Sequence, residues 1–183
     1  AYAKTLTTLA NEGANAFYTG PIAQAIVDKI GITTAANDGS AITPGVTTMA
    51  DAGSAGWRNF DFFKLTVIDR AKTRVFAFIN IAGLGMLTNI VEQHPEDMKP
   101  EELARLAKKY PDIVVGVKTA HWEAPTWTAV DKAIEAGRLM NKPVMVDFGY
   151  FKPERPYWQL VTEKLRTGDI STHAFRATVP WVD

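Results

Sequence analysis

The chain has 183 residues and a formal net charge of +0, and 46% of its residues are hydrophobic. These values are ordinary for one globular domain and do not indicate binding to nucleic acid or to an anionic membrane surface. The sequence has no cysteine, which excludes disulfides, a thiolate nucleophile and cysteine metal ligands. A metal site would therefore use His, Asp, Glu or modified Lys, as hydrolytic Zn, Mn or Fe centres do.

No apolar run reaches the roughly 18 residues that can span a bilayer. The N-terminus lacks the basic-then-apolar order of a signal peptide. We therefore expect a soluble protein that does not associate with membranes, and its compartment cannot be read from the sequence.

Residues 1–31 are predicted to form a helical hairpin. Pro21 stands in the first turn of its second helix, and Gly31 ends that helix. Residues 32–43 are rich in Gly, Ser, Thr, Asn and Asp, which predicts a linker.

Strands and helices alternate through residues 44–183. The predicted strands are Val46–Asp51, Val75–Ile81, Ile113–Thr119, Val144–Phe148 and Asp169–Thr172, and the predicted helices are Phe60–Arg70, Pro100–Tyr110, Thr128–Met140 and Arg155–Leu165. This alternation is typical of a parallel sheet with crossover helices. The order alone fits either an open doubly wound sheet or part of a (β/α)₈ barrel. A full barrel usually needs about 250 residues, so five units in roughly 140 residues favour an incomplete one.

The third predicted strand, Ile113–Thr119, is a nearly continuous apolar run with Lys118 near its end. Such a run suits a strand that is buried on both faces. Burying a free ammonium group costs free energy, so Lys118 either extends to water past the strand end or is paired or chemically altered. Ligands of parallel α/β sheets bind at the carboxyl ends of the strands, where Lys118 lies.

Other polar residues are expected at the same rim. Lys118, Asp147 and His173 come from three consecutive strands and are the predicted metal ligands. The alternative roles are a cap on the following turn for Asp147 and a hydrogen-bonded rim histidine for His173. A possible substrate pocket would be lined by Asp51, Asn80, His121 and Trp122.

Three further signals are weaker. Gly83-Leu84-Gly85 lacks the third glycine and the helix spacing of a dinucleotide-binding motif. The glycines of residues 53–56 are expected to form a tight turn after the first strand rather than an anion site. His94 precedes Pro95 in a polar loop and is expected to be solvated.

Four segments resemble the amidohydrolase superfamily, and most closely its dihydroorotase-like and D-aminoacylase-like amidohydrolases and deacetylases. They are GVTTMADAGSAG (45–56), VGVKTA (115–120), PVMVDFG (143–149) and GDISTH (168–173). The resemblance covers residues 43–183. It implies a distorted (β/α)₈ barrel that uses one or two divalent metals to hydrolyse amide or cyclic amide bonds.

The resemblance also implies roles for single residues. Lys118 matches the fourth-strand lysine, which CO₂ converts to a metal-bridging carbamate, and His173 matches the sixth-strand histidine ligand. Asp147 occupies the fifth-strand position where a histidine is more usual. The first-strand His-x-His pair and the last-strand aspartate that acts as general base do not occur in this sequence. The implied cofactor is a divalent metal, with zinc preferred and manganese or iron as alternatives.

The N-terminal segments AKTL (3–6) and EGANAFYTGPIA (12–23) resemble a helical piece of γ-glutamyltranspeptidases. This resemblance covers residues 1–30 and includes neither the catalytic threonine nor the substrate-binding residues of that family. It therefore implies no activity for this chain.

The predicted function is metal-dependent hydrolysis of the amide C–N bond of a small N-acyl or cyclic amide. The alternative is a non-catalytic remnant or oligomerising scaffold derived from such a barrel. An incomplete barrel leaves open edges at its first and last strands, and open edges predict homo-oligomers. The N-terminal helices could instead cover one of these edges.

Overall fold

The computed structural model describes residues 7, 11, 48–149 and 152–173. The predicted helical hairpin and linker lie outside the described residues, apart from Thr7 and Asn11. None of the helices in the described part of the chain has the length and apolar character needed to cross a membrane.

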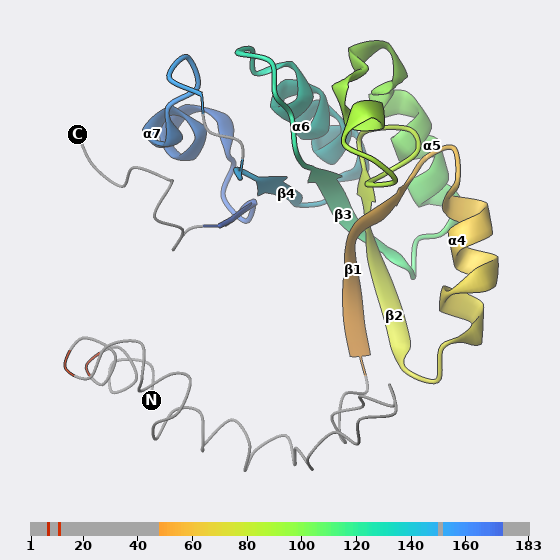
Figure 1. The fold of residues 1–183 in the computed structure, drawn as a ribbon. Helices are drawn as coiled ribbons and strands as arrows, with labels where there is room; N and C mark the ends of the chain where they lie inside the picture. The colour runs from red at the N-terminus through yellow and green to blue at the C-terminus, as the bar shows by residue number, and fades with distance from the viewer. Residues whose placement is uncertain (1–6, 8–10, 12–47, 150–151, 174–183) are drawn as a thin grey trace, which may run out of the picture. The chain divides into compact units, whose positions relative to one another are not determined.

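Five strands form a single sheet in the order β1-β2-β3-β4-β5, and each neighbouring pair is parallel (Figure 1). They are β1 (Thr48–Gly56), β2 (Arg74–Asn80), β3 (Val114–Thr119), β4 (Val144–Asp147) and β5 (Ile170–Thr172). This confirms the predicted parallel sheet. Strands adjacent in sequence are also neighbours in the sheet, as in a (β/α) barrel.

The connections are mainly helical. They contain α4 (Phe60–Thr66), η1 (Ile68–Arg70), η2 (Ile90–Gln93), η3 (Pro95–Asp97), α5 (Pro100–Lys109), α6 (Thr128–Met140), α7 (Tyr157–Gln159) and the π-helical turn η4 (Leu160–Lys164). Figure 1 shows α4, α5 and α6 along the same side of the sheet.

For the last predicted helix, Arg155–Leu165, the predicted first residue is wrong. The first α-helical residue is Tyr157, and the chain then continues as the π-turn η4. Pro156 is extended, with φ −68° and ψ 147°, and a proline also disfavours helical backbone in the residue before it. The helix therefore cannot begin at Arg155.

The first predicted strand is also corrected. β1 does not end at Asp51 but runs to Gly56, with a register shift between Ala52 and Gly56. Gly53 has φ +98°, and the Asp51 Oδ2 atom accepts hydrogen bonds from the backbone N–H groups of Gly53 at 3.0 Å and Ser54 at 2.9 Å. The glycines of residues 53–56, which predicted a tight turn, lie instead in the continuing strand, at the register shift of a β-bulge.

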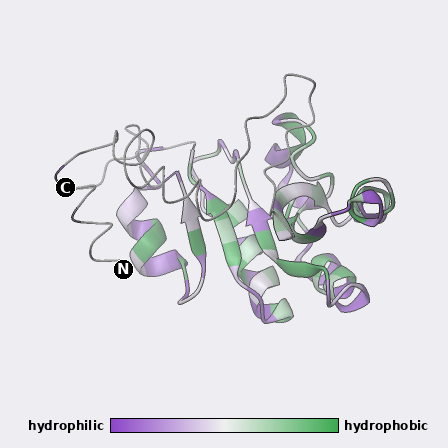
Figure 2. Cartoon of the chain, turned by 90° about the horizontal axis from the view of Figure 1, so that it is seen from below, coloured by the Kyte–Doolittle hydropathy of each residue, from purple (hydrophilic) through white to green (hydrophobic). Residues whose placement is uncertain are grey.

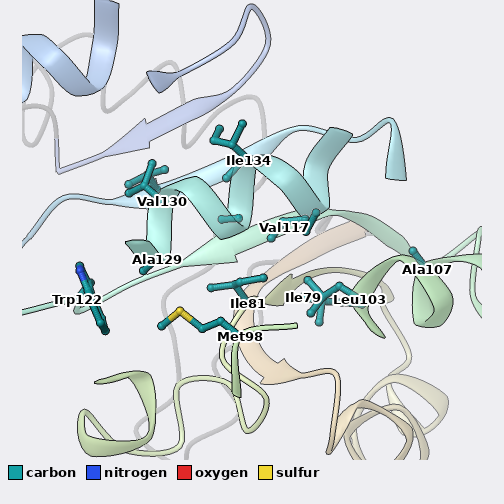
Figure 3. Close-up of a cluster of buried hydrophobic side chains, with 14 of the residues drawn as sticks. Ile79, Ile81, Met98, Leu103, Ala107, Val117, Trp122, Ala129, Val130 and Ile134 are labelled. Carbon is teal, nitrogen blue, oxygen red and sulfur yellow. The ribbon is translucent and has the colours of Figure 1, made fainter. Parts of the chain in front are cut away.

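The hydrophobic core lies between the sheet and the helices (Figure 3). It contains Ala77, Ile79, Val117, Val144 and Val146 from the strands and Leu103, Ala129, Val130, Ala133 and Ile134 from α5 and α6. Figure 2 shows that hydrophobic residues predominate in the strands, whereas the helices carry both kinds.

Side chains alternate between the two faces of a strand. Because Ile79, Val117 and Val146 face the helices, their neighbours Asn80, Lys118 and Asp147 project from the opposite face. The register pairs Asn80 with Lys118, so these side chains are neighbours at the carboxyl ends of β2 and β3. The alternation of side chains along the strands thus places the hydrophobic core on one face of the sheet. The polar residues Asn80, Lys118 and Asp147, called the polar group below, lie on the other face.

Gly53 provides the first prediction. A Cβ atom at Gly53 would lie 2.6 Å from the Lys118 Cβ atom, whereas at Gly168, with φ +94°, it would meet nothing within 4 Å. Gly168→Ala should lower the free energy of unfolding by about 1–2 kcal/mol through backbone strain alone. Gly53→Ala should lower it by a further 1–3 kcal/mol or so, because the Lys118 side chain must shift.

Urea unfolding of the two variants beside the parent protein measures this difference. Equal losses for Gly53→Ala and Gly168→Ala would show that the Lys118 side chain does not pack on Gly53.

Candidate functional site

The carboxylate of Asp147, the last residue of β4, is the centre of the polar group. Its Oδ1 atom lies 3.0 Å from His173 Nε2. Its Oδ2 atom lies 4.0 Å from Lys118 Nζ and 3.9 Å from His121 Nε2. The structure therefore brings together the three residues predicted as metal ligands and adds His121 to them.

Lys118 is buried, with 5% of its side chain exposed. The alternative in which this lysine extends into solvent is therefore wrong. Burial lowers the pKa of the Lys118 amine, and the negative charges of Asp147, Glu92 and Asp51 oppose this shift without cancelling it. The site thus favours a neutral amine more than the surface does.

Asp147 also caps the turn that follows its strand, which is the alternative role considered for it in the sequence. The backbone N–H of Gly149 donates to its Oδ1 atom at 2.8 Å, so the carboxylate caps the turn after β4. This hydrogen bond fixes the side chain while its other oxygen, Oδ2, faces Lys118 and His121. A capping role and a role in the site are therefore compatible.

Both histidines near Asp147 have left-handed backbone conformations, with φ 52° at His121 and φ 60° at His173. This region is unfavourable for residues other than glycine and is enriched at functional sites. Each histidine follows a strand, β3 or β5. The left-handed residue turns the chain at the point where its imidazole approaches Asp147.

Glu92 is a site residue that the sequence did not indicate. It lies in the short η2 turn, and 2% of its side chain is exposed. Its Oε2 atom lies 2.6 Å from His121 Nδ1, and its Oε1 atom accepts a hydrogen bond from Asn80 Nδ2 at 3.0 Å. Burial raises the pKa of Glu92, although the bonds to His121 and Asn80 and the charge of Lys118 act in the opposite direction.

The residues of the predicted pocket take different places. Asn80 is buried beside Glu92 and also donates to the Gly53 carbonyl at 3.4 Å. Asp51 lies within β1, just before the bulge, rather than after the strand; its carboxylate accepts from the Gly53 N–H, and its charge acts on Lys118. Trp122 packs in the hydrophobic core, where its indole N–H donates to the Thr126 carbonyl at 2.8 Å (Figure 3).

His94, in contrast, is largely exposed and pairs with Glu96, its Nδ1 atom 2.9 Å from Oε1. This confirms the expectation of a solvated histidine. The Glu96 side chain is also exposed. This surface pair therefore joins the same two groups as His121 and Glu92, an imidazole and a carboxylate, but in contact with solvent.

The donor types around Asp147 suit a divalent metal. Imidazole and carboxylate are common ligands of zinc, and the lysine would become an oxygen ligand once it carried a carbamate. Among the residues that the structure describes, however, no group of three His, Asp or Glu side chains is arranged to hold a metal ion. His173 and Asp147 contact each other instead, so a metal would have to replace that contact.

Comparison with known proteins gives related sequences over most of the chain. A deacetylase from Brucella anthropi and one from Agrobacterium fabrum are each 33% identical over 138 residues, which is 72% of this chain. A deacetylase from Enterococcus faecalis is 27% identical over 140 residues, or 73% of the chain. The chain spans only 34%, 33% and 37% of these three relatives, respectively.

Two solved structures have a similar fold. A dihydroorotase matches with a TM-score of 0.63 and 28% identity, over 72% of this chain and 38% of its own. An adenine deaminase matches with a TM-score of 0.56 and 26% identity, over 69% of this chain and 33% of its own. Together with the five-stranded parallel sheet, these matches confirm the fold class of an incomplete (β/α)₈-type barrel.

The model of the gamma-glutamyltranspeptidase family matches residues 1–51, a minor part of the chain that contains the segments noted above. The deacetylases, the dihydroorotase and the adenine deaminase support the other resemblance, to amidohydrolase-like proteins, over the greater part of the chain.

The ionisation of Lys118 provides the second prediction. The Lys118 amine should titrate below the ordinary lysine value of 10.5, whereas Lys109, which is hydrogen-bonded to Asp61, should titrate above it. Asp147→Asn should lower the pKa of Lys118 further, because it removes the largest favourable charge. The ¹³Cε chemical shifts of labelled lysines, followed against pH, measure the pKa of Lys118 and Lys109 in the parent and of Lys118 in Asp147→Asn.

The same shift has a consequence for stability. Between the lowered pKa and 10.5, the folded protein binds fewer protons at Lys118 than the unfolded chain does. The contribution of Lys118 to the free energy of unfolding should therefore rise with pH across this window. A Lys118 signal that titrates together with the surface lysines would contradict the burial of its amine.

Proposed function

We propose that this chain carries part of a metal-dependent hydrolase that cleaves the amide C–N bond of a small N-acyl or cyclic amide. The observation that carries the proposal is the group formed by Asp147 with Lys118 and His173 at the carboxyl ends of β3, β4 and β5. Three of the similar proteins are deacetylases and one is a dihydroorotase, which supports chemistry at an amide.

Lys118, Asp147 and His173 would hold the divalent metal, with zinc preferred and manganese or iron as alternatives. The metal would act as a Lewis acid toward the amide carbonyl and a water molecule. Asn80, Asp51 and His121 would border the substrate, and Trp122 would position the segment after His121 through its packing in the core.

Lys118 would join the site as a carbamate. Its neutral amine attacks the carbon of CO₂ and a N–C bond forms, while one C=O electron pair moves to oxygen. The nitrogen then loses a proton to a neighbouring base. Burial, which lowers the pKa of the Lys118 amine, increases the neutral fraction that can react. The product replaces a buried cation by an anionic oxygen ligand.

The third prediction tests this function. The purified chain should bind zinc, and Asp147→Asn and His173→Asn should each weaken zinc binding at least tenfold or so, because each removes a proposed ligand. His94→Asn is the matched control, since His94 is exposed and lies outside the site.

Zinc affinity by competition with a chromogenic chelator and hydrolysis of N-acetyl amino acids and dihydroorotate provide the two measurements. If the parent chain does not bind zinc, the proposed metal dependence of its function is wrong. Equal zinc binding and hydrolysis by the parent and Asp147→Asn would favour a non-catalytic scaffold.

The second candidate function is a scaffold that associates through its sheet edges. Among the residues that the structure describes, β1 and β5 each have one neighbouring strand, and the first residues of β1, Thr48–Ala50, are exposed. Unpaired edge strands can add strands from another chain. We propose that copies of the chain associate through β1.

The fourth prediction follows from this edge. Met49→Lys places a charge on an edge residue that is 52% exposed and should weaken self-association, because a charged edge resists strand pairing. Leu139→Lys is the control, since Leu139 is 51% exposed but lies on α6. Sedimentation velocity over a range of concentrations measures the effect, and a parent chain that stays monomeric would reject the scaffold.

A further inference from the structure

A hollow lies at the amino ends of β4 and β5, at the opposite end of these strands from Asp147 and His173. Its volume is about 370 Å³, which is within the range of small-molecule sites. The charged and N–H donor residues that line this β4–β5 hollow are Lys142, Arg166, Thr167, Gly168 and Asp169.

The guanidinium group of Arg166 is held in place by Asp169. Its Nε atom donates to Asp169 Oδ2 at 2.9 Å, and its Nη2 atom donates to Oδ1 at 2.8 Å. The Nη2 atom also donates to the Lys142 carbonyl at 2.9 Å. The guanidinium is therefore oriented by the protein itself, and no side-chain freedom of Arg166 has to be lost when a ligand binds.

The Asp169 carboxylate is turned away from the hollow, with 1% of its side chain exposed. Besides the Arg166 side chain, it accepts from the backbone N–H groups of Val144 and Arg166, each at 2.8 Å. Burial acts to raise the pKa of Asp169, but the hydrogen bonds from Arg166 and Val144 lower it overall. The carboxylate is thus ionised and paired, and the positive charge of Lys142 remains uncompensated in the hollow.

Several donors of the hollow are available to a ligand. Within the part of the chain that the structure describes, no hydrogen bond uses Arg166 Nη1, the Lys142 ammonium or the N–H groups of Thr167 and Gly168. Gly168 has φ +94°, and a Cβ atom there would meet nothing within 4 Å, so the space beside this turn is open. Two cationic side chains and two consecutive N–H groups are donors that suit an anion.

We propose that the β4–β5 hollow binds a small oxyanion, a phosphate or carboxylate group, between Lys142, Arg166 and the turn at Thr167 and Gly168. The oriented guanidinium would contact the oxygens through Nη1, and Lys142 would supply the net positive charge. Because the hollow and the polar group lie at opposite ends of the strands, this inference does not rest on the proposed function.

A second hollow provides a comparison within the same sheet. It lies at the amino ends of β2 and β3, has a volume of about 400 Å³, and is lined in part by Lys72, Arg74 and Asp112. Here the Arg74 guanidinium lies over the Phe76 ring at 4.5 Å. Asp112 is exposed, and none of the ion pairs among the described residues joins it to Arg74. An exposed carboxylate repels an anion, so we expect no oxyanion site in this hollow.

The fifth prediction is tested by titrating the ¹⁵N-labelled chain with inorganic phosphate, and separately with acetate, at constant ionic strength in Tris chloride. The amide signals of Thr167 and Gly168 should shift and saturate, whereas that of Lys72 should not. Lys142→Gln should weaken the affinity about three- to tenfold, because it removes one charge-assisted contact. Lys72→Gln is the matched control and should leave the affinity unchanged.

The two anions identify the ligand group. Saturation by phosphate alone assigns a phosphate site, and saturation by acetate at the same signals assigns a carboxylate site. The proposal is overturned if neither anion gives a saturable shift of Thr167 and Gly168 in the parent chain. It is also overturned if the Lys72 signal responds equally, or if Lys142→Gln binds as the parent does, since the shifts would then reflect unspecific ion effects.

Discussion

The buried contact between Lys118 and Asp147 is the constraint on which the rest of the site depends. A lysine on the buried face of β3 is tolerated only if its amine is neutral or compensated. Both conditions are partly met. Burial lowers the pKa of Lys118, which favours the neutral amine, and Asp147, Glu92 and Asp51 supply negative charge that compensates the ammonium form. The backbone must also leave room for the lysine side chain, which Gly53 provides in the β1 bulge.

The polar group is assembled in layers from separate parts of the fold. The alternation of β2, β3 and β4 places Asn80, Lys118 and Asp147 on the face opposite the core. After β3 and β5, the left-handed backbones of His121 and His173 then bring their imidazoles near Asp147. The left-handed backbone of these two histidines is intrinsically unfavourable, and the packing of the sheet on α5 and α6 must support it.

The two functional proposals make different demands on the same sheet. Hydrolysis requires the carboxyl ends of β3, β4 and β5, whereas association requires the edge of β1. Because these regions are distinct, a change at Asp147 and a change at Met49 can be separated experimentally. The chain spans about a third of the length of the deacetylases that it matches.

By itself, the sequence determined that the strands are parallel, the helices Pro100–Lys109 and Thr128–Met140 to within a residue, and the grouping of Lys118, Asp147 and His173. Those features follow from local periodicity and from the rule that parallel strands end at one rim. Only the tertiary structure decided that β1 continues through a bulge, that Trp122 enters the core, and that Glu92 is buried against His121. Such contacts join segments about thirty residues apart, and no local pattern encodes which polar residue will lose its water when they meet.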